Sequence, residues 1–231
     1  MAQRGDSEGG RKSYGHPCLI AQALDLLGDR WTLLIIRDLM AGLHRYTEIQ
    51  LNCTGMSPNV LSDRLKRLEA EGLVIRHYER GLPPRVEYHL SEKGWAVRPI
   101  LLSLLEYSRN HLLDDGESPV DQMPTDFAVR VVPTFAFQPE RAAGLAATLA
   151  VEIADRDACG RWTFRIADGH ILPRRNGEEE VDVTLRTTTD GFLRFVRCES
   201  PVEDCGELVG RLPVARAVQE CFAPIEGPPA A

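Results

Sequence analysis

The apolar positions of the first half follow helical spacing up to about residue 71 and strand-like spacing directly after it. Leu61, Leu65 and Leu68 recur at i, i+4 and i+7, which predicts one buried stripe on an amphipathic helix. The helix is expected to begin after Ser57, a suitable N-cap followed by proline, and to end before Gly72.

Two strand-like segments come next. Residues 73–78 have strand composition, and residues 85–90 alternate apolar and polar side chains. Residues 81–84, Gly-Leu-Pro-Pro, form a turn because proline cannot donate to a strand ladder. The sequence therefore predicts a β-hairpin, while residues 24–39 and 46–49 supply supporting helices.

The polar face of the predicted helix carries groups suited to DNA. Lys66 and Arg67 can neutralise phosphates or read guanine, Asn59 can read adenine, and Ser57 can hold a phosphate at the helix start. An ordinary surface helix is the alternative, but a hairpin with a basic tip directly after a basic helix favours DNA binding. The predicted DNA-binding residues are Ser57, Asn59, Ser62, Asp63, Lys66, Arg67, His77, Arg80, Arg85 and Arg45.

The stretch from Pro17 to about Leu113 resembles the HxlR-type winged helix-turn-helix regulators, a branch close to the MarR-like regulators. The resemblance implies a homodimer that binds a pseudo-palindromic double-stranded DNA operator, with the first and last helices of the winged domain at the subunit interface. Residues 99–113 carry more apolar surface than one small domain needs, so either a partner helix or the second domain covers them. The motifs that carry the resemblance are Pro17-Cys18, LLGDRWTLLIIRDL at residues 26–39, RYTEI at 45–49, SPNVLSDRLKRLEAEGLVIR at 57–76 and PPRVEYHLSEKG at 83–94.

Charge and composition divide the chain near residue 115. Residues 1–115 hold 15 basic and 15 acidic side chains, so the net charge of −7 lies in the second half. Residues 114–124 are polar, contain two prolines and a glycine, and are typical of a linker. The expected organisation is a disordered tail (1–15), a winged helix-turn-helix DNA-binding and dimerisation domain (16–113), the linker (114–124), a second domain (125–224) and a flexible tail (225–231).

The second half mixes helical and strand-like patterns, which makes the expected fold class α+β. Strands are expected at 127–137, where Pro133 interrupts the pattern, and at 161–166, 171–172 and 181–186; helices are expected at 140–155, 190–196 and 214–222. Residues 162–166, 181–186, 188–196 and 206–210 resemble the sterol carrier protein-type fold, a curved sheet covered by helices around an apolar tunnel. After Gly210 the chain is shorter than in those carriers.

That resemblance implies a sensor for a small apolar or aromatic effector that changes the spacing of two winged domains. Simple core packing explains the same aromatic positions, so both interpretations stay open. A lipid or polyketide carrier protein is the alternative from another class. The predicted ligand-binding residues are Trp162, Phe164, Phe135, Phe137, Leu145, Leu149, Phe192 and Phe195.

Cys18 supports a second hypothesis, a thiol-based redox-sensing regulator. It follows Pro17 at the start of the first predicted helix, where the positive helix end lowers a thiol pKa. Some members of the resembled family sense oxidants through a cysteine in this position. A small buried thiol at a dimer contact is the alternative, and Cys53 is the nearest rival as a sensor.

Other function classes find little support in the sequence. There is no Gly-rich phosphate loop, GxSxG elbow or HExxH helix, and the six cysteines lack metal-binding spacing, so neither an enzyme nor a cofactor or metal is expected. No apolar run approaches the roughly 18 residues of a membrane span, and residues 1–15 do not resemble a signal peptide. A cytoplasmic protein without membrane contact is therefore expected.

Overall fold

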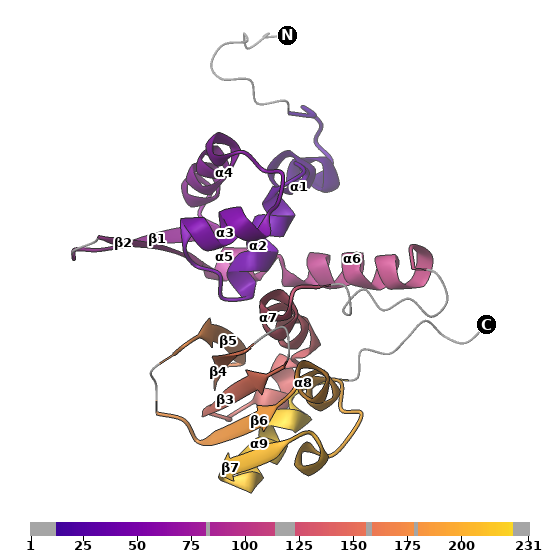
Figure 1. The fold of residues 1–231 in the computed structure, drawn as a ribbon. Helices are drawn as coiled ribbons and strands as arrows, with labels where there is room; N and C mark the ends of the chain where they lie inside the picture. Colours follow the sequence, from indigo (N-terminus) through magenta and orange to yellow (C-terminus); the bar gives the residue numbers. More distant parts are fainter. Residues whose placement is uncertain (1–12, 82–83, 114–122, 156–158, 178–179, 224–231) are drawn as a thin grey trace, which may run out of the picture.

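The computed structural model describes residues 13–81, 84–113, 123–155, 159–177 and 180–223. Most of the expected N-terminal tail and linker, the centre of the hairpin turn and the expected C-terminal tail lie outside these ranges. Figure 1 shows the described chain as two halves joined at helix α7, with the hairpin and helix α6 projecting on opposite sides.

The first half is a winged helix-turn-helix, as the sequence predicts. The leucine stripe of the predicted helix is buried, with Leu61, Leu65 and Leu68 at most 1% exposed. Ser57 caps this helix, because its hydroxyl accepts a hydrogen bond from the Val60 amide. The elements are α1 (Leu19–Leu27), α2 (Thr32–Met40), α3 (Tyr46–Asn52), α4 (Pro58–Ala70), β1 (Val74–Glu79), β2 (Arg85–Leu90), α5 (Glu92–Trp95) and α6 (Arg98–His111).

The second half is a five-stranded sheet with helices packed on one face. The strand order is β5-β4-β3-β6-β7, with β3 and β6 parallel and the other neighbours antiparallel. Alternate residues of β3 and β4 point into a core shared with the helices, while the opposite face carries ion pairs such as Glu152 to Arg186. The elements are α7 (Thr125–Ala136), a 3-10 turn (Pro139–Ala142), β3 (Ala147–Ala154), β4 (Cys159–Ala167), β5 (His170–Arg175), β6 (Val183–Thr187), α8 (Thr189–Val196), a 3-10 turn (Val202–Asp204), β7 (Glu207–Gly210) and α9 (Leu212–Glu220).

Two predicted elements of this half were wrong in type. The expected strand at 127–137 is helix α7, which continues through Pro133 and is buried along most of its length. The expected helix at 140–155 is a 3-10 turn followed by strand β3, separated by Gly144 with its positive φ of 78°. A short, continuously apolar run does not distinguish a buried helix from a buried strand, and pairing on both sides of β3 outweighs the helix propensity of its alanines.

Helix α7 packs the two halves together. Phe135 belongs to the core of the winged half, and the Arg98 guanidinium at the start of α6 donates to the backbone carbonyls of Thr134, Phe135 and Phe137. The Arg130 Nη1 donates to the Gly42 carbonyl at 3.1 Å. A Cβ at Gly42, where φ is +76°, would lie 1.9 Å from the Pro173 carbonyl oxygen, so this contact requires glycine.

No helix among the described residues is both long and apolar enough to cross a membrane.

Candidate nucleic-acid interface

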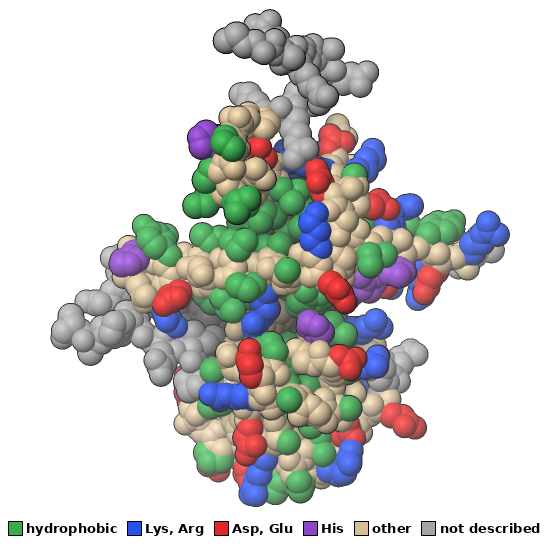
Figure 2. Space-filling model, turned by 180° about the vertical axis from the view of Figure 1, so that it is seen from behind, with side chains coloured by type: hydrophobic (Ala, Val, Ile, Leu, Met, Phe, Trp, Pro, Cys, Tyr) green, Lys and Arg blue, Asp and Glu red, His purple; other side chains and the backbone are tan. Residues whose placement is uncertain are grey.

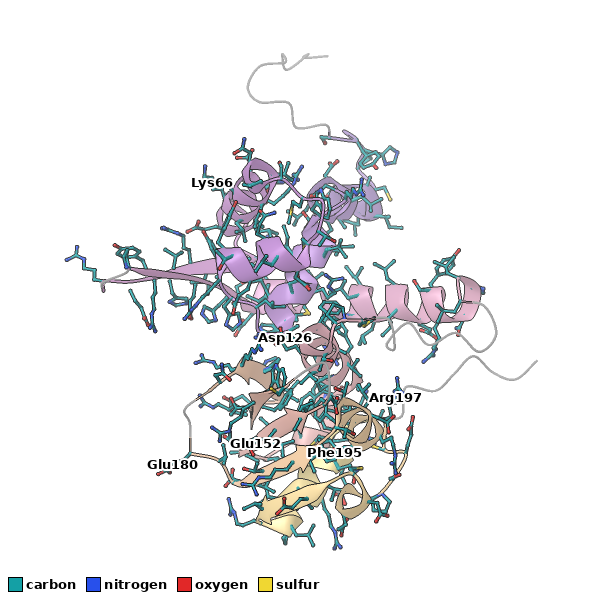
Figure 3. All side chains as sticks on the ribbon, in the orientation of Figure 1. Lys66, Asp126, Glu152, Glu180, Phe195 and Arg197 are labelled. Carbon is teal, nitrogen blue, oxygen red and sulfur yellow. The ribbon has the colours of Figure 1, made fainter. Side chains whose placement is uncertain are left out.

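Helix α4 presents a polar outer face opposite its leucine stripe. Asn59, Asp63 and Lys66 are exposed on this face and Ser62 is half-buried. Figure 3 shows Lys66 on the side of α4 that faces away from the rest of the molecule. These four side chains lie along one accessible surface, which has the width and chemistry that a DNA major groove accepts.

Two arginines on the same helix point back toward the protein. Arg67, predicted to contact DNA, is half-buried and donates to the backbone carbonyl of Asp25 in α1. Arg64, which the sequence reasoning missed, forms an ion pair with Asp29, with 3.3 Å between Nε and Oδ1. Both contacts hold α4 against the α1–α2 region, so they position the outer face.

Asp29 also fixes the start of α2. Its carboxylate accepts hydrogen bonds from the backbone amides of Trp31 and Thr32 at 3.0 and 3.1 Å, and from the Thr32 hydroxyl. The residue thus caps one helix and pairs with a charge on another. Aspartate is a preferred capping residue, so Asp29 shortly before the apolar run of residues 33–36 was a helix-start signal in the sequence.

The hairpin is a two-stranded wing with basic residues near its tip. Glu79 pairs with Arg85 at the last register position of β1 and β2, and Arg80 follows directly. Arg80 and Arg85 are both exposed. In Figure 2 the wing projects from the molecule and ends in Lys or Arg side chains. This tip can follow a phosphate backbone.

Arg45 and His77, also predicted to contact DNA, come from elements other than α4. The exposed Arg45 precedes α3, and its Nε lies 3.9 Å from Glu87 Oε1 on β2. The His77 ring is perpendicular to the His89 ring at 5.0 Å. Both residues therefore sit along the wing, and His77 faces another histidine.

The predicted ligand-binding residues fall into two separate cores. Trp162, Phe164, Phe137, Leu149, Phe192 and Phe195 are at most 2% exposed in the core of the second half, where Leu145 packs against them. Phe164 stacks on Phe192 at 5.4 Å, and the Trp162 indole N–H donates to Asp126 Oδ1 at 2.9 Å. Phe135 instead completes the core of the winged half. In this structure these side chains pack within the two hydrophobic cores.

A cleft of about 1000 Å³ lies between the two halves, which sequence reasoning did not anticipate because its walls come from both. Arg45 and Glu87 line one wall, while Asp126, Arg130 and Arg174 line the other. Arg130 pairs with Asp126 at 3.4 Å. Its volume and its place between two packed units agree with small-molecule sites, but its lining is mostly charged and polar, whereas such sites are mostly apolar.

The two candidate redox thiols have opposite environments. Cys18 is exposed at the N-cap of α1, and hydrogen bonds from the backbone amides of Ala21 and Ile20 lower its pKa. Cys53 is buried, and burial together with the neighbouring Asp38 carboxylate raises its pKa to about 12. Of these two thiols, only Cys18 has a pKa shifted toward easier ionisation, and the thiolate is the reactive form.

Known proteins match the winged half. The model of the HxlR-like helix-turn-helix family matches residues 26–115. The HTH-type transcriptional regulator sll1512 of Synechocystis sp. is 36% identical over 90 residues, which are 39% of this chain and 67% of the relative. YvaP of Bacillus subtilis, also an HTH-type transcriptional regulator, is 45% identical over 80 residues, which are 35% of this chain and 74% of the relative.

Among solved structures, the reduced form of the transcriptional regulator YodB from Bacillus subtilis is 33% identical, with a TM-score of 0.38 over 44% of this chain and 100% of that one. The family model ends at residue 115, before α7. With its winged helix-turn-helix and these relatives, the chain belongs to the HxlR-like helix-turn-helix family of transcription regulators.

Proposed function

We propose that the protein is a homodimeric regulator that binds a pseudo-palindromic operator, with α4 in the major groove and the wing along the adjacent backbone. The observation that carries this proposal is the outer face of α4, where Asn59, Asp63 and Lys66 are exposed while the leucines opposite are buried. The hydrogen bond of Arg67 and the ion pair of Arg64 hold that face in a fixed orientation. In this proposal residues 16–113 form the DNA-binding and dimerisation domain.

A second copy of the chain is the proposed partner of α1 and α6. Leu19 and Ile20 on α1 are 79% and 71% exposed, α6 exposes Leu104 and Leu105, and Leu112 directly after α6 is exposed as well. Figure 2 shows hydrophobic side chains gathered over the region of these two helices. An apolar surface of this kind on a monomer is unfavourable in water, and a two-fold contact of the same helices covers it on both copies. It would also place two α4 helices about one DNA turn apart.

We assign the sensor role to residues 125–224. The packing of α7 against the winged half supports this role, because a shift of α7 would move Phe135 within the winged core and change the Arg98 contacts. A sheet covered on one face by helices also agrees with a sterol carrier-like domain. The proposed effector is a small apolar or aromatic molecule. To change operator affinity tenfold, the effector must bind one dimer geometry more tightly than the other by about 1.4 kcal/mol of free energy.

Thiol-based redox sensing through Cys18 is the second candidate, favoured by the exposure and lowered pKa of this thiol. It predicts that a Cys18→Ser protein loses any change in DNA binding that peroxide or a quinone induces in the wild type. A matched Cys159→Ser protein, which lacks another exposed thiol, should keep the response. An unchanged response of the Cys18→Ser protein would exclude this candidate.

Fluorescence anisotropy tests the main proposal. The full-length protein is titrated with a duplex from upstream of its own gene and with a scrambled duplex, at two salt concentrations. We expect tighter binding of the first duplex, and binding that weakens with salt because phosphate contacts release counterions. An Arg80→Ala/Arg85→Ala protein should bind both duplexes more weakly, to the same extent. The slope of log affinity against log salt concentration should be smaller by about two.

Sedimentation velocity tests the dimer separately. Wild type is expected to sediment as a dimer, and a Leu104→Asp/Leu105→Asp protein as a monomer with unchanged circular dichroism. If wild type is a monomer, the proposed homodimer is wrong, but the assignment of α4 to the DNA major groove is not affected. Equal binding of a broad set of genomic duplexes and of scrambled DNA would contradict the operator-binding proposal.

A further inference from the structure

Histidine side chains gather beside the wing, on the side of the second half (Figure 2). His44 comes from the turn between α2 and α3, and Glu87 and His89 come from β2. One ligand atom from each of these three residues lies within 4.8 Å of the others. All three are half-buried, and neither the DNA-binding surface nor the effector proposal uses them.

The hairpin register explains this gathering. Glu87 and His89 are two residues apart, so they share one face of β2. His77 pairs with Glu87 across the hairpin and therefore shares that face. The His44 and His89 ring centroids are 4.1 Å apart, His77 lies 5.0 Å from His89, and Glu87 Oε2 lies 3.2 Å from His89 Nε2.

His89 stands at the centre of the cluster, because its ring lies 4.1 Å from the His44 ring and 5.0 Å from the His77 ring. Imidazole nitrogens are common metal ligands. A hydrogen bond between the His44 ring and the Leu39 backbone fixes the ring, a common arrangement for metal-ligating histidines.

We propose that His44, Glu87 and His89 bind one divalent transition-metal ion of the Zn²⁺ class, with His77 placed to become a fourth ligand. Two imidazoles and a carboxylate form a ligand set that Zn²⁺ and its neighbours in the first transition row accept. Ca²⁺ and Mg²⁺ take oxygen ligands and do not suit it. His44 is distant in sequence from Glu87 and His89, so the sequence contains no metal-binding spacing motif for this site.

An ion can reach this site from the cleft between the two halves, because His44 and Glu87 line its wall. The nearest cationic groups are compatible with an incoming ion. Arg174 is exposed, so its side chain can turn to solvent, and Arg45 is 3.9 Å from the other oxygen of Glu87, which leaves Oε2 for the metal. Arg130 is already paired with Asp126.

The site would join the wing to the helical body. His44 belongs to the turn before α3, whereas Glu87 and His89 belong to wing strand β2 and His77 belongs to β1. A bound ion fixes the angle at which the wing leaves the domain, and that angle decides whether the wing tip follows the DNA backbone. By linkage, an ion that binds one wing orientation more tightly must change operator affinity.

Metal titration of the full-length, reduced and chelator-treated protein tests the proposal. Zn²⁺ is titrated in competition with a chromophoric chelator, and Co²⁺ is titrated while its absorption spectrum is recorded. We expect one ion per chain, a Co²⁺ spectrum without thiolate charge-transfer bands, and a higher Tm with Zn²⁺ because the ion binds the folded state. His89→Gln and Glu87→Gln should each weaken the affinity by at least about tenfold.

His111→Gln, on the exposed face of α6, is the matched control and should bind like wild type. Circular dichroism checks that each variant is folded. The proposal is overturned if wild type does not compete with the chelator, if His89→Gln and Glu87→Gln bind as wild type does, or if the Co²⁺ complex shows thiolate bands.

Discussion

Arg64, in the middle of helix α4, forms an ion pair with Asp29, with 3.3 Å between Nε and Oδ1, and the same carboxylate caps the start of α2. This relationship links the helix assigned to the major groove with the helix that supports it. Base contacts depend on the angle at which a recognition helix enters the groove, so residues that fix this angle matter although they touch no base.

Substitutions at these two positions should differ in their effect on stability. Asp29→Ala removes the acceptor of two backbone amides and a hydroxyl, and we expect it to lower the free energy of unfolding by about 1–2 kcal/mol. Arg64→Gln removes only a half-exposed ion pair, and we expect a loss below about 1 kcal/mol. Urea unfolding measures both. Equal losses would mean that the cap is not the main role of Asp29.

Lys66 and Arg67 are neighbours in sequence but should have different roles. Lys66→Ala removes an exposed charge, so we expect weaker operator binding by about 1–3 kcal/mol if it contacts a base, with unchanged unfolding. Arg67→Ala breaks the hydrogen bond to the Asp25 carbonyl and should lower the free energy of unfolding by about 1 kcal/mol. Anisotropy and urea unfolding on the same preparations separate the two effects, and the opposite assignment of effects would contradict the contact of Arg67.

Arg98, at the start of α6, should be important for stability. Its guanidinium donates to three carbonyls at the end of α7, so Arg98→Ala leaves those acceptors without this donor. We expect a loss of about 1.5–3 kcal/mol in the free energy of unfolding and a smaller loss for Arg98→Lys, which keeps a charge and a donor. If both variants unfold like wild type, α6 and α7 are not coupled through this residue.

The winged half was predictable because its signals are local and agree with one another. Ser57 before a proline, leucines at i, i+4 and i+7, and a Pro-rich turn between alternating segments each specify one structure, and α4, β1 and β2 follow them. The contacts of Arg64 and Arg67 were not predictable in the same way. A basic residue on a helix can point to solvent or to a neighbouring helix, and only the packed fold decides between them.

The second half shows where such reasoning fails. The segments that became α7 and β3 are apolar over most of their length, so their periodicity is weak, and their state is set by contacts with β4, β6 and the winged core. The histidine cluster beside the wing could not be predicted for the same reason, because contacts between distant parts of the chain create it. His44 is about 40 residues from its partners, and only the register of the hairpin and the position of the α2–α3 turn bring them together.

Acid should destabilise the protein through His44. Its pKa in the folded protein is about 3, below the ordinary value of 6.5, and the unfolded chain therefore binds a proton over a range where the folded chain does not. The free energy of unfolding should fall as the pH decreases from about 6.5 toward 3. His44 faces His89, Arg174 and Arg130, and these groups act in the same direction as burial. Urea unfolding at several pH values measures the slope.

His44→Gln should flatten that slope, because glutamine does not titrate. The exposed His111 provides the control, and a His111→Gln protein should keep the slope of wild type. A His44→Gln protein with an undiminished loss of stability between pH 6.5 and 3 would show that other groups cause the acid sensitivity.

Cys18 should react at a lower pH than Cys198. Its pKa is lowered by the amides of Ala21 and Ile20, whereas burial raises the pKa of Cys198, which is also exposed at its surface. The thiolate is the reactive form, so limited alkylation with iodoacetamide should label Cys18 at a lower pH than Cys198. Peptide mass spectrometry after short labelling times at a series of pH values measures both.

The buried Cys53 should be the least reactive of the three compared thiols. Its pKa of about 12 predicts almost no labelling in the folded protein at neutral pH, and full labelling once urea removes the burial and the contact with Asp38. If Cys18 is labelled no faster than Cys198, the helix start does not activate it and the redox candidate loses its physical basis. If it is labelled first but oxidants leave DNA binding unchanged, Cys18 is reactive without being a sensor.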